Sequence, residues 1–199
     1  MTDFDKVQII AVSKTFSMDK ITPLIKHGHI HYGENKVQEA LSKWTDIKSE
    51  FPNIKLHMIG KLQTNKVKFV VPLFDYIHSL DNVKLAEKIS IEQKKNNKKL
   101  KIFIQVNIGD ESQKNGINVN ELENFYKICV EKLNLDIIGL MCIPPNNEKN
   151  RYYFSEMQKL KAIINVRELS MGMSEDYLHA IDFEASFIRI GSKIFGSRN

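Results

Sequence analysis

Short apolar runs alternate with segments of helical period along almost the whole 199-residue sequence. We expect eight of these runs to be strands: Val7–Val12, Ile30–Gly33, Lys55–Gly60, Tyr76–Ser79, Lys101–Asn107, Asp136–Ile143, Glu168–Met171 and Phe187–Gly191. The runs at 101–107 and 136–143 are almost continuously apolar, which is typical of strands covered on both faces in a parallel sheet. The pattern favours an α/β fold, a single closed (β/α)8 barrel of the TIM type, over an open doubly wound sheet.

The segments between these runs carry the periodicity and end signals of helices. Met18–Lys26 and Glu121–Leu133 each place apolar residues on one face. Asp81, Asn120 and Ser174 stand where N-caps of three helices are expected. No linker, repeat or glycine-rich dinucleotide fingerprint interrupts the pattern, so we predict one domain over residues 1–199.

Composition narrows the class of protein. The net charge is +5, but the densest basic run, Lys94–Lys99, closes a predicted helix and contains no aromatic residue for base stacking, so no nucleic-acid partner is expected. No apolar run approaches the roughly 20 residues that span a bilayer. The start lacks an apolar signal core, so a cytoplasmic protein without membrane contact is expected. Cys129 and Cys142 are interpreted as reduced core residues.

Polar and small residues follow each apolar run, at the end of the barrel where active sites of this fold lie. Lys14 ends the first run, and partial desolvation there would favour the neutral amine, a nucleophile toward aldehydes. The alternative is an ordinary exposed lysine at a strand end. From the residue pattern alone, both interpretations stay open.

The last two predicted strand ends have the composition of a phosphate site. Ser170, Gly172 and Ser174 follow the seventh run, and Gly191 and Ser192 follow the eighth. In such barrels the loops after strands seven and eight, with a helix N-terminus, form a recurrent phosphate cradle. Ordinary turn chemistry is the alternative, because glycine and serine are common in turns.

Arg189 alternates with isoleucines on the last run, so it is expected to point into the barrel. A buried arginine requires an anion or another acceptor. It could donate a hydrogen bond to a pyridine nitrogen, a partner type known for pyridoxal 5′-phosphate (PLP). The alternative is a structural ion pair, for which Glu34 is the candidate.

Together these residues resemble the YggS/PROSC family of PLP-homeostasis proteins, which share the fold type III PLP-binding barrel of alanine racemase. The resemblance covers nearly the whole chain. Its segments are Ala11–Thr15, Tyr32–Asn35, Val37–Glu39, His57–Gly60, Leu62–Lys66, Ile77–Ser79, Val106–Ile108, Lys114–Ile117, Gly139–Met141, Ile143–Pro144, Leu169–Ser174, Arg189–Gly191 and Ile194–Gly196.

The resemblance implies a cofactor-binding set. It makes Lys14 the lysine that holds PLP as a Schiff base and places Arg189 at the pyridine nitrogen. The remaining implied residues surround the phosphate (Ser170, Gly172, Gly191 and Ser192) or lie near the ring (Asn35, with Ile59 and Met171 as packing neighbours).

The sequence also departs from the family pattern. It begins almost at its first strand, lacking the usual N-terminal helix, and the resulting apolar surface is expected to reduce stability or attract a partner. Lys61 replaces a usual proline, Phe16-Ser17 replaces a Lys-Pro step, and the segment before Glu168 is shortened. None of these changes touches the cofactor-bonding residues.

The function implied is intracellular PLP (vitamin B6) homeostasis as a carrier or buffer, not dedicated catalysis. Arg189 is always protonated, so a pyridine nitrogen bonded to it cannot hold a proton, and the ring is a weaker electron sink. The racemases add acid/base groups from a further β domain and a partner subunit, and this sequence ends just after the barrel. We expect a monomer without catalytic residues, with PLP-dependent apo-enzymes as possible recipients.

Two rival functions remain open. The first is a racemase-like PLP enzyme that acts on amino acids through a pocket residue such as Tyr32 or His78. The second is a PLP-free phosphosugar barrel enzyme. A metal site at His27, His29 and His31 is not expected, because no further ligand has suitable spacing, while His57 and His78 are expected to line the pocket.

Overall fold

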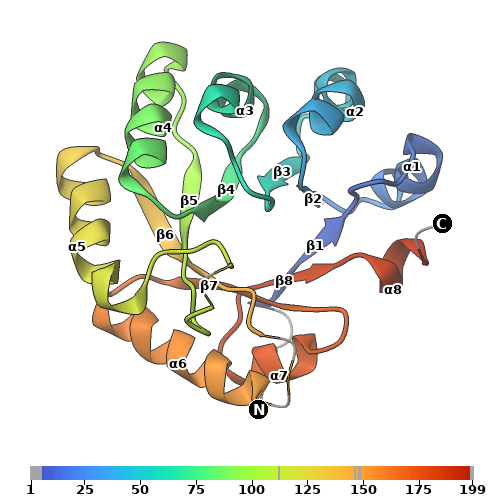
Figure 1. Cartoon of the computed structure of the whole chain (residues 1–199). Helices are drawn as coiled ribbons and strands as arrows, with labels where there is room; N and C mark the ends of the chain where they lie inside the picture. The colour runs from blue at the N-terminus through green and yellow to red at the C-terminus, as the bar shows by residue number, and fades with distance from the viewer. Residues whose placement is uncertain (1–5, 112, 146, 148, 198–199) are drawn as a thin grey trace.

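The computed structural model describes residues 6–111, 113–145, 147 and 149–197. Eight parallel strands close into a barrel in chain order, as predicted, and helices surround them on the outside (Figure 1). The strands are β1 (Gln8–Val12), β2 (His31–Glu34), β3 (Lys55–Met58), β4 (Tyr76–Leu80), β5 (Lys101–Gln105), β6 (Asp136–Met141), β7 (Glu168–Met173) and β8 (Phe187–Ile190).

The α-helices follow the strands around the ring. They are α1 (Met18–Lys26), α2 (Val37–Glu50), α3 (Val67–Leu73), α4 (Val83–Asn96), α5 (Leu122–Lys127), α6 (Asn150–Ile163), α7 (Tyr177–Asp182) and α8 (Ser192–Phe195). Short 3₁₀ turns η2 (Thr64–Lys66) and η3 (Val119–Glu121) precede α3 and α5, and the π-helical segment η4 (Ile128–Lys132) follows α5. The single helix predicted over 121–133 is therefore three segments of different pitch.

The predicted helix caps are displaced by one or two residues. Asn82, not Asp81, caps α4, since its side chain accepts a hydrogen bond of 2.9 Å from the Leu85 N–H. Asn118, not Asn120, caps η3. The helix α7 starts after Asp176 and not at Ser174, and Asp176 accepts from the Met173 N–H at 2.7 Å. Short polar side chains close together compete for each cap, and only the backbone path selects one.

The core has two layers because strand side chains alternate between the barrel interior and the helices. The larger layer lies between strands and helices and includes the fully buried Trp44 and Phe154. The smaller layer fills the barrel interior and consists of Ile10, Tyr76, Phe103, Ile138, Met141 and Phe187. The polar side chains of His57, His78 and Arg189 are buried in the same interior.

Both cysteines are free and buried, as expected. Burial raises the pKa of each thiol to about 12. Over the described residues, no helix combines the length and the apolarity that crossing a membrane would require.

Candidate functional site

One cavity of about 290 Å³ opens at the carboxyl ends of the strands. This volume is at the lower end of the range of about 300–1,000 Å³ that is usual for small-molecule sites. Its lining comprises Val12, Lys14, Asn35, Ile59, Ile143, Met173, Ser174, Glu175, Arg189, Gly191 and Ser192. Six of the nine residues implied by the sequence therefore meet in one place: Lys14, Asn35, Ile59, Arg189, Gly191 and Ser192.

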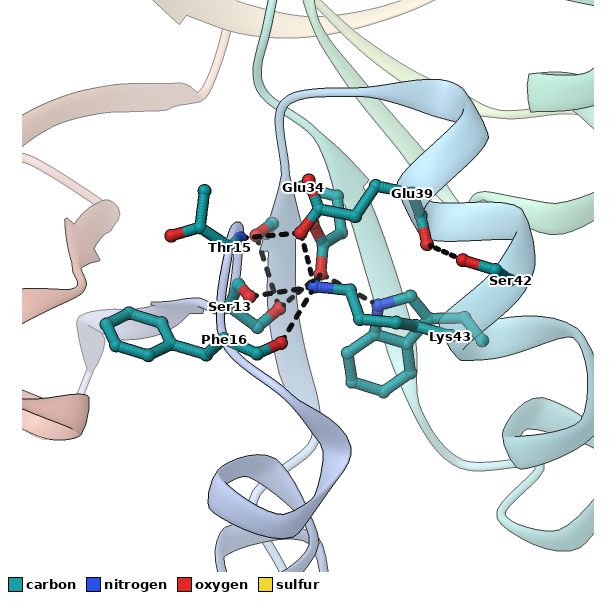
Figure 2. A network of polar contacts seen from close by, with 9 residues as sticks. Ser13, Thr15, Phe16, Glu34, Glu39, Ser42 and Lys43 are labelled. Atoms are coloured by element: carbon teal, nitrogen blue, oxygen red, sulfur yellow. Dashed lines mark hydrogen bonds and ion pairs between the residues drawn. The ribbon is translucent and has the colours of Figure 1, made fainter. Parts of the chain in front are cut away.

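Lys14 lies in the turn between β1 and α1. Side chains of helix α2 hold its neighbours Ser13 and Thr15 in that turn (Figure 2). The Lys43 Nζ donates to the backbone oxygen of Ser13 at 2.8 Å and lies 3.4 Å from that of Phe16. The Thr15 N–H, at a positive φ of 67°, donates to the Glu39 carboxylate at 2.5 Å. The backbone on both sides of Lys14 is thus bonded to a rigid element, as a positioned reactive amine requires.

Two carboxylates hold Lys43 in place. Its Nζ lies 2.7 Å from Glu34 Oε1 and 2.8 Å from Glu39 Oε1, and the Glu34 side chain is fully buried. Burial alone would raise the pKa of Glu39, but the hydrogen bonds from Lys43 and Thr15 outweigh it and lower that pKa.

The alternative prediction for Arg189, an ion pair with Glu34, is wrong. Glu34 Oε1 accepts from Lys43, from the Ser13 hydroxyl at 2.8 Å and from the Trp44 indole at 3.0 Å. These partners all lie on the β1–β2–α2 side of the barrel, so the carboxylate is already engaged there.

Arg189, on β8, lines the cavity and is only 5% exposed. Its Nη1 donates to the Ser170 backbone oxygen at 2.7 Å and to the Ser170 hydroxyl at 2.8 Å, and its Nη2 donates to the Cys142 backbone oxygen at 2.8 Å. All three acceptors are neutral. Burial lowers the pKa of Arg189, yet an arginine stays protonated in proteins. Within the described chain it is therefore a buried cation that favours an electron-rich ligand.

Small and hydroxylated residues line another part of the cavity. Gly191 is the residue before α8, and the Ser192 and Ser174 hydroxyls lie 3.1 Å apart. Two hydroxyls and a glycine backbone in one corner can donate several hydrogen bonds to an anion. The cavity lining has two basic side chains, Lys14 and Arg189, against one carboxylate, Glu175.

Three residues implied by the sequence lie elsewhere. Ser170 is fully buried beneath the cavity, where it contacts Arg189 and His78, and Met171 is fully buried in the outer core. Gly172 has a φ of 89°, and a Cβ there would clash with Ala180 of α7. The strand β7 continues to Met173, two residues beyond its predicted end, so the residues that reach the cavity are Met173, Ser174 and Glu175.

Some residues that line the cavity were not in the cofactor-binding set predicted from the sequence. Ser174 was recognised in the phosphate-type loop but was also assigned to a helix start. Val12 and Ile143 form apolar walls, and their signal was only that each ends an apolar run. His57 and His78 do not line the cavity as predicted, because both are fully buried inside the barrel. Nowhere in the described chain do three or more His, Cys, Asp or Glu side chains form a group that could hold a metal ion.

Comparison with known proteins agrees with this geometry. The model of a family described as "Alanine racemase, N-terminal domain" matches residues 2–199. The chain belongs to this family. Among its members, the protein named "Pyridoxal phosphate homeostasis protein" of Aquifex aeolicus is 37% identical over 200 residues, which covers 96% of this chain and 87% of that protein. The protein of the same name in Vibrio alginolyticus is 35% identical over 98% of this chain and 88% of its own length. The resemblance inferred from the sequence is therefore confirmed.

Solved structures show the same relationship. PipY of Synechococcus elongatus, in a structure without PLP, superposes with a TM-score of 0.91 at 32% identity and covers 96% of this chain and 94% of that one. PipY with PLP bound superposes with a TM-score of 0.88 over 96% and 93% of the two chains. An alanine racemase from Bartonella henselae, at 19% identity and a TM-score of 0.74, shares the fold over 58% of its length.

Proposed function

We propose that this chain binds PLP, held as a Schiff base on Lys14, and acts in PLP homeostasis as a carrier or buffer. The observation that carries the proposal is that Lys14, Arg189, Gly191 and Ser192 line one cavity. The relatives named for PLP homeostasis and the PLP-bound structure of PipY support it. When bound, PLP supplies an aldehyde that an amine can attack and a ring that withdraws electrons.

The residues of the cavity match the three parts of this molecule. The half-buried Lys14 supplies the amine, on a turn that Lys43 and Glu39 hold in place. Gly191, with the hydroxyls of Ser174 and Ser192, suits a phosphate group. Arg189 uses three bonds to protein acceptors, and because a guanidinium has five N–H donors it can still donate toward a ring nitrogen.

A carrier explains the remaining features better than an enzyme does. Tyr32 and His78, which we considered as racemase-type acid/base groups, are both fully buried and do not line the cavity. The permanently charged Arg189 would leave a bound ring nitrogen without a proton, which weakens the ring as an electron sink. We therefore propose a non-catalytic monomer, one domain over residues 1–199, with PLP-dependent apo-enzymes as recipients.

Attachment to Lys14 can be tested by mass spectrometry. Protein incubated with PLP and reduced with borohydride should gain one pyridoxyl phosphate, and peptide mapping should place it on Lys14. Lys14→Ala should lose the adduct and remain folded, whereas Lys26→Ala, at an exposed lysine of α1, should keep it. An unmodified Lys14 in the wild-type protein would overturn the assignment.

A second measurement separates carrier from enzyme. The PLP-loaded protein is incubated with amino acids in heavy water, and exchange of the Cα proton is followed by NMR. We expect no exchange above that of free PLP. Exchange at enzymatic rates would refute the carrier function while leaving PLP binding intact.

A further inference from the structure

Four side chains and Arg189 form a continuous hydrogen-bonded chain through the barrel interior. His31 Nδ1 lies 2.9 Å from His57 Nε2, and His57 Nδ1 lies 2.9 Å from His78 Nε2. The Ser170 hydroxyl then lies 2.8 Å from His78 Nδ1 and accepts a hydrogen bond of 2.8 Å from Arg189 Nη1. His57, His78 and Ser170 are fully buried, and His31 is 8% exposed. We call His31, His57, His78 and Ser170 the relay.

The charge of Arg189 gives the relay one direction. A guanidinium only donates, so Ser170 Oγ accepts from it. The Ser170 proton then needs an acceptor, and His78 Nδ1 is the one in contact. His78 must therefore carry its proton on Nε2 and donate to His57, and His57 must do the same toward His31. The reverse order would leave a buried hydroxyl proton without an acceptor in the relay, which is unfavourable.

The surroundings keep the rings neutral and immobile. Burial lowers the pKa values of His57 and His78 well below the ordinary value, and for His78 the positive charge of Arg189 adds to this. His57 stacks on Tyr76 with ring centroids 4.1 Å apart, and His78 stacks on Phe103 at 4.3 Å. A neutral ring with a fixed orientation can offer only one acceptor, so each ring transmits the direction to the next.

We propose that the relay positions Arg189 for the cofactor: it fixes the Ser170 hydroxyl as an acceptor, and this bond sets the direction in which the guanidinium faces the cavity. The inference rests on the proposed PLP site, because it assigns Arg189 a ligand there. His31, His57, His78 and Ser170 are positioning residues, since none of them lines the cavity.

The first test uses the protein without PLP, so it does not depend on the proposed function. Two-bond ¹H–¹⁵N NMR identifies which ring nitrogen carries the proton. We expect a single tautomer, protonated on Nε2, for His31, His57 and His78 at neutral pH. Ser170→Ala should produce mixed or reversed tautomers at His78 and His57. His27→Gln, at an exposed histidine, should leave the three rings unchanged. A proton on His78 Nδ1 in the wild-type protein would overturn the relay.

The second test measures the effect on the cofactor. Ser170→Ala should weaken PLP binding about ten-fold and shift the absorption band of the bound cofactor, because one acceptor of the charged Arg189 is lost. Ser170→Thr, which keeps the hydroxyl, should restore the band. His57→Phe should also shift the band, although His57 does not line the cavity. Phe187 packs on the rings of His57 and His78 without a hydrogen bond, so Phe187→Leu should leave the band unchanged.

The outcomes separate the two proposals. If wild-type protein does not take up PLP on Lys14, the proposed PLP site is refuted. The NMR test of the histidine tautomers, which uses protein without PLP, then still decides whether the relay has one direction. Normal PLP binding with an unshifted band in both Ser170→Ala and His57→Phe would refute the relay alone. If His57→Phe does not fold, Ser170→Ala decides, because it removes a single oxygen atom.

Discussion

The Nζ of Lys43 lies 2.8 Å from the backbone oxygen of Ser13, so a helix that follows the second strand fixes the residue beside Lys14. The same amine is shared by Glu34 and Glu39, so one cation serves two carboxylates in a largely buried ion-pair cluster (Figure 2). The turn that carries Lys14 is therefore held by side chains of α2.

Removing the Lys43 charge should destabilise the protein. Lys43→Met leaves the buried Glu34 carboxylate without its cation, for which a loss of about 3–5 kcal/mol in the free energy of unfolding is expected. Urea denaturation measures this loss. Lys48→Met breaks the more exposed pair with Asp75 and should cost about 1 kcal/mol or less. Equal losses of unfolding free energy in the two variants would contradict a special stabilising role for the ion pair between Lys43 and Glu34.

Gly172 should resist substitution more strongly than another glycine with the same backbone conformation. Gly172→Ala combines a φ of 89° with a clash against Ala180, so we expect a loss of about 2–3 kcal/mol. Gly28→Ala is the matched control, because its φ is 96° but the space around its Cα is open, and it should cost about 1 kcal/mol. Thermal or urea unfolding distinguishes the two variants. If Gly172→Ala had no effect on the free energy of unfolding, α7 could not pack against Gly172 as closely as the contact with Ala180 requires.

Stability should fall as the pH is lowered through the histidine range. Burial lowers the pKa of His31 to about 4, with the neighbouring His29, Lys55 and Lys101 adding to this and Asp75 opposing it. The unfolded chain titrates near 6.5, so between about pH 7 and pH 4 it binds protons that the folded chain does not. His31 alone should then account for a loss of about 3 kcal/mol across that window, and His57 and His78 add to it in the same direction.

Urea denaturation at several pH values measures this dependence. His31→Gln should flatten the curve, and His27→Gln should leave it unchanged, because His27 is exposed. The carboxylates with lowered pKa values, such as Glu39, contribute a loss of stability only below about pH 5, so the histidine effect is measured between pH 7 and pH 5. A flat profile from pH 7 to pH 5 would show that the relay rings are hydrated or protonated in the folded protein.

The two cysteines should be unreactive until the protein unfolds. Cys142 is fully buried and Cys129 is equally inaccessible, and burial raises both thiol pKa values to about 12, so little thiolate exists at pH 8. An aromatic disulfide reagent should titrate no thiol in the native protein and both in denaturant. Rapid reaction of one thiol in the native state would show that β6 or η4 opens locally.

The sequence by itself determined the barrel and most of the site. Strand period, continuous apolar runs and turn residues are local properties, and the closed barrel brings the carboxyl ends of all strands to one face whatever their exact bounds. Lys14, Arg189, Gly191 and Ser192 were therefore candidates from the strand after which, or on which, each one stands, and the family resemblance implied their roles.

Tertiary structure decided which side chains actually meet. The two additional residues of β7 place Met173 and Ser174 at the cavity and leave Ser170 beneath it, because each strand residue advances the chain by about 3.3 Å toward the carboxyl end. The partners in the relay are 26, 21 and 92 residues apart in sequence, so no local pattern could pair them. Only closure of the barrel brings these strands around one interior, where a buried cation and three neutral rings must satisfy one another.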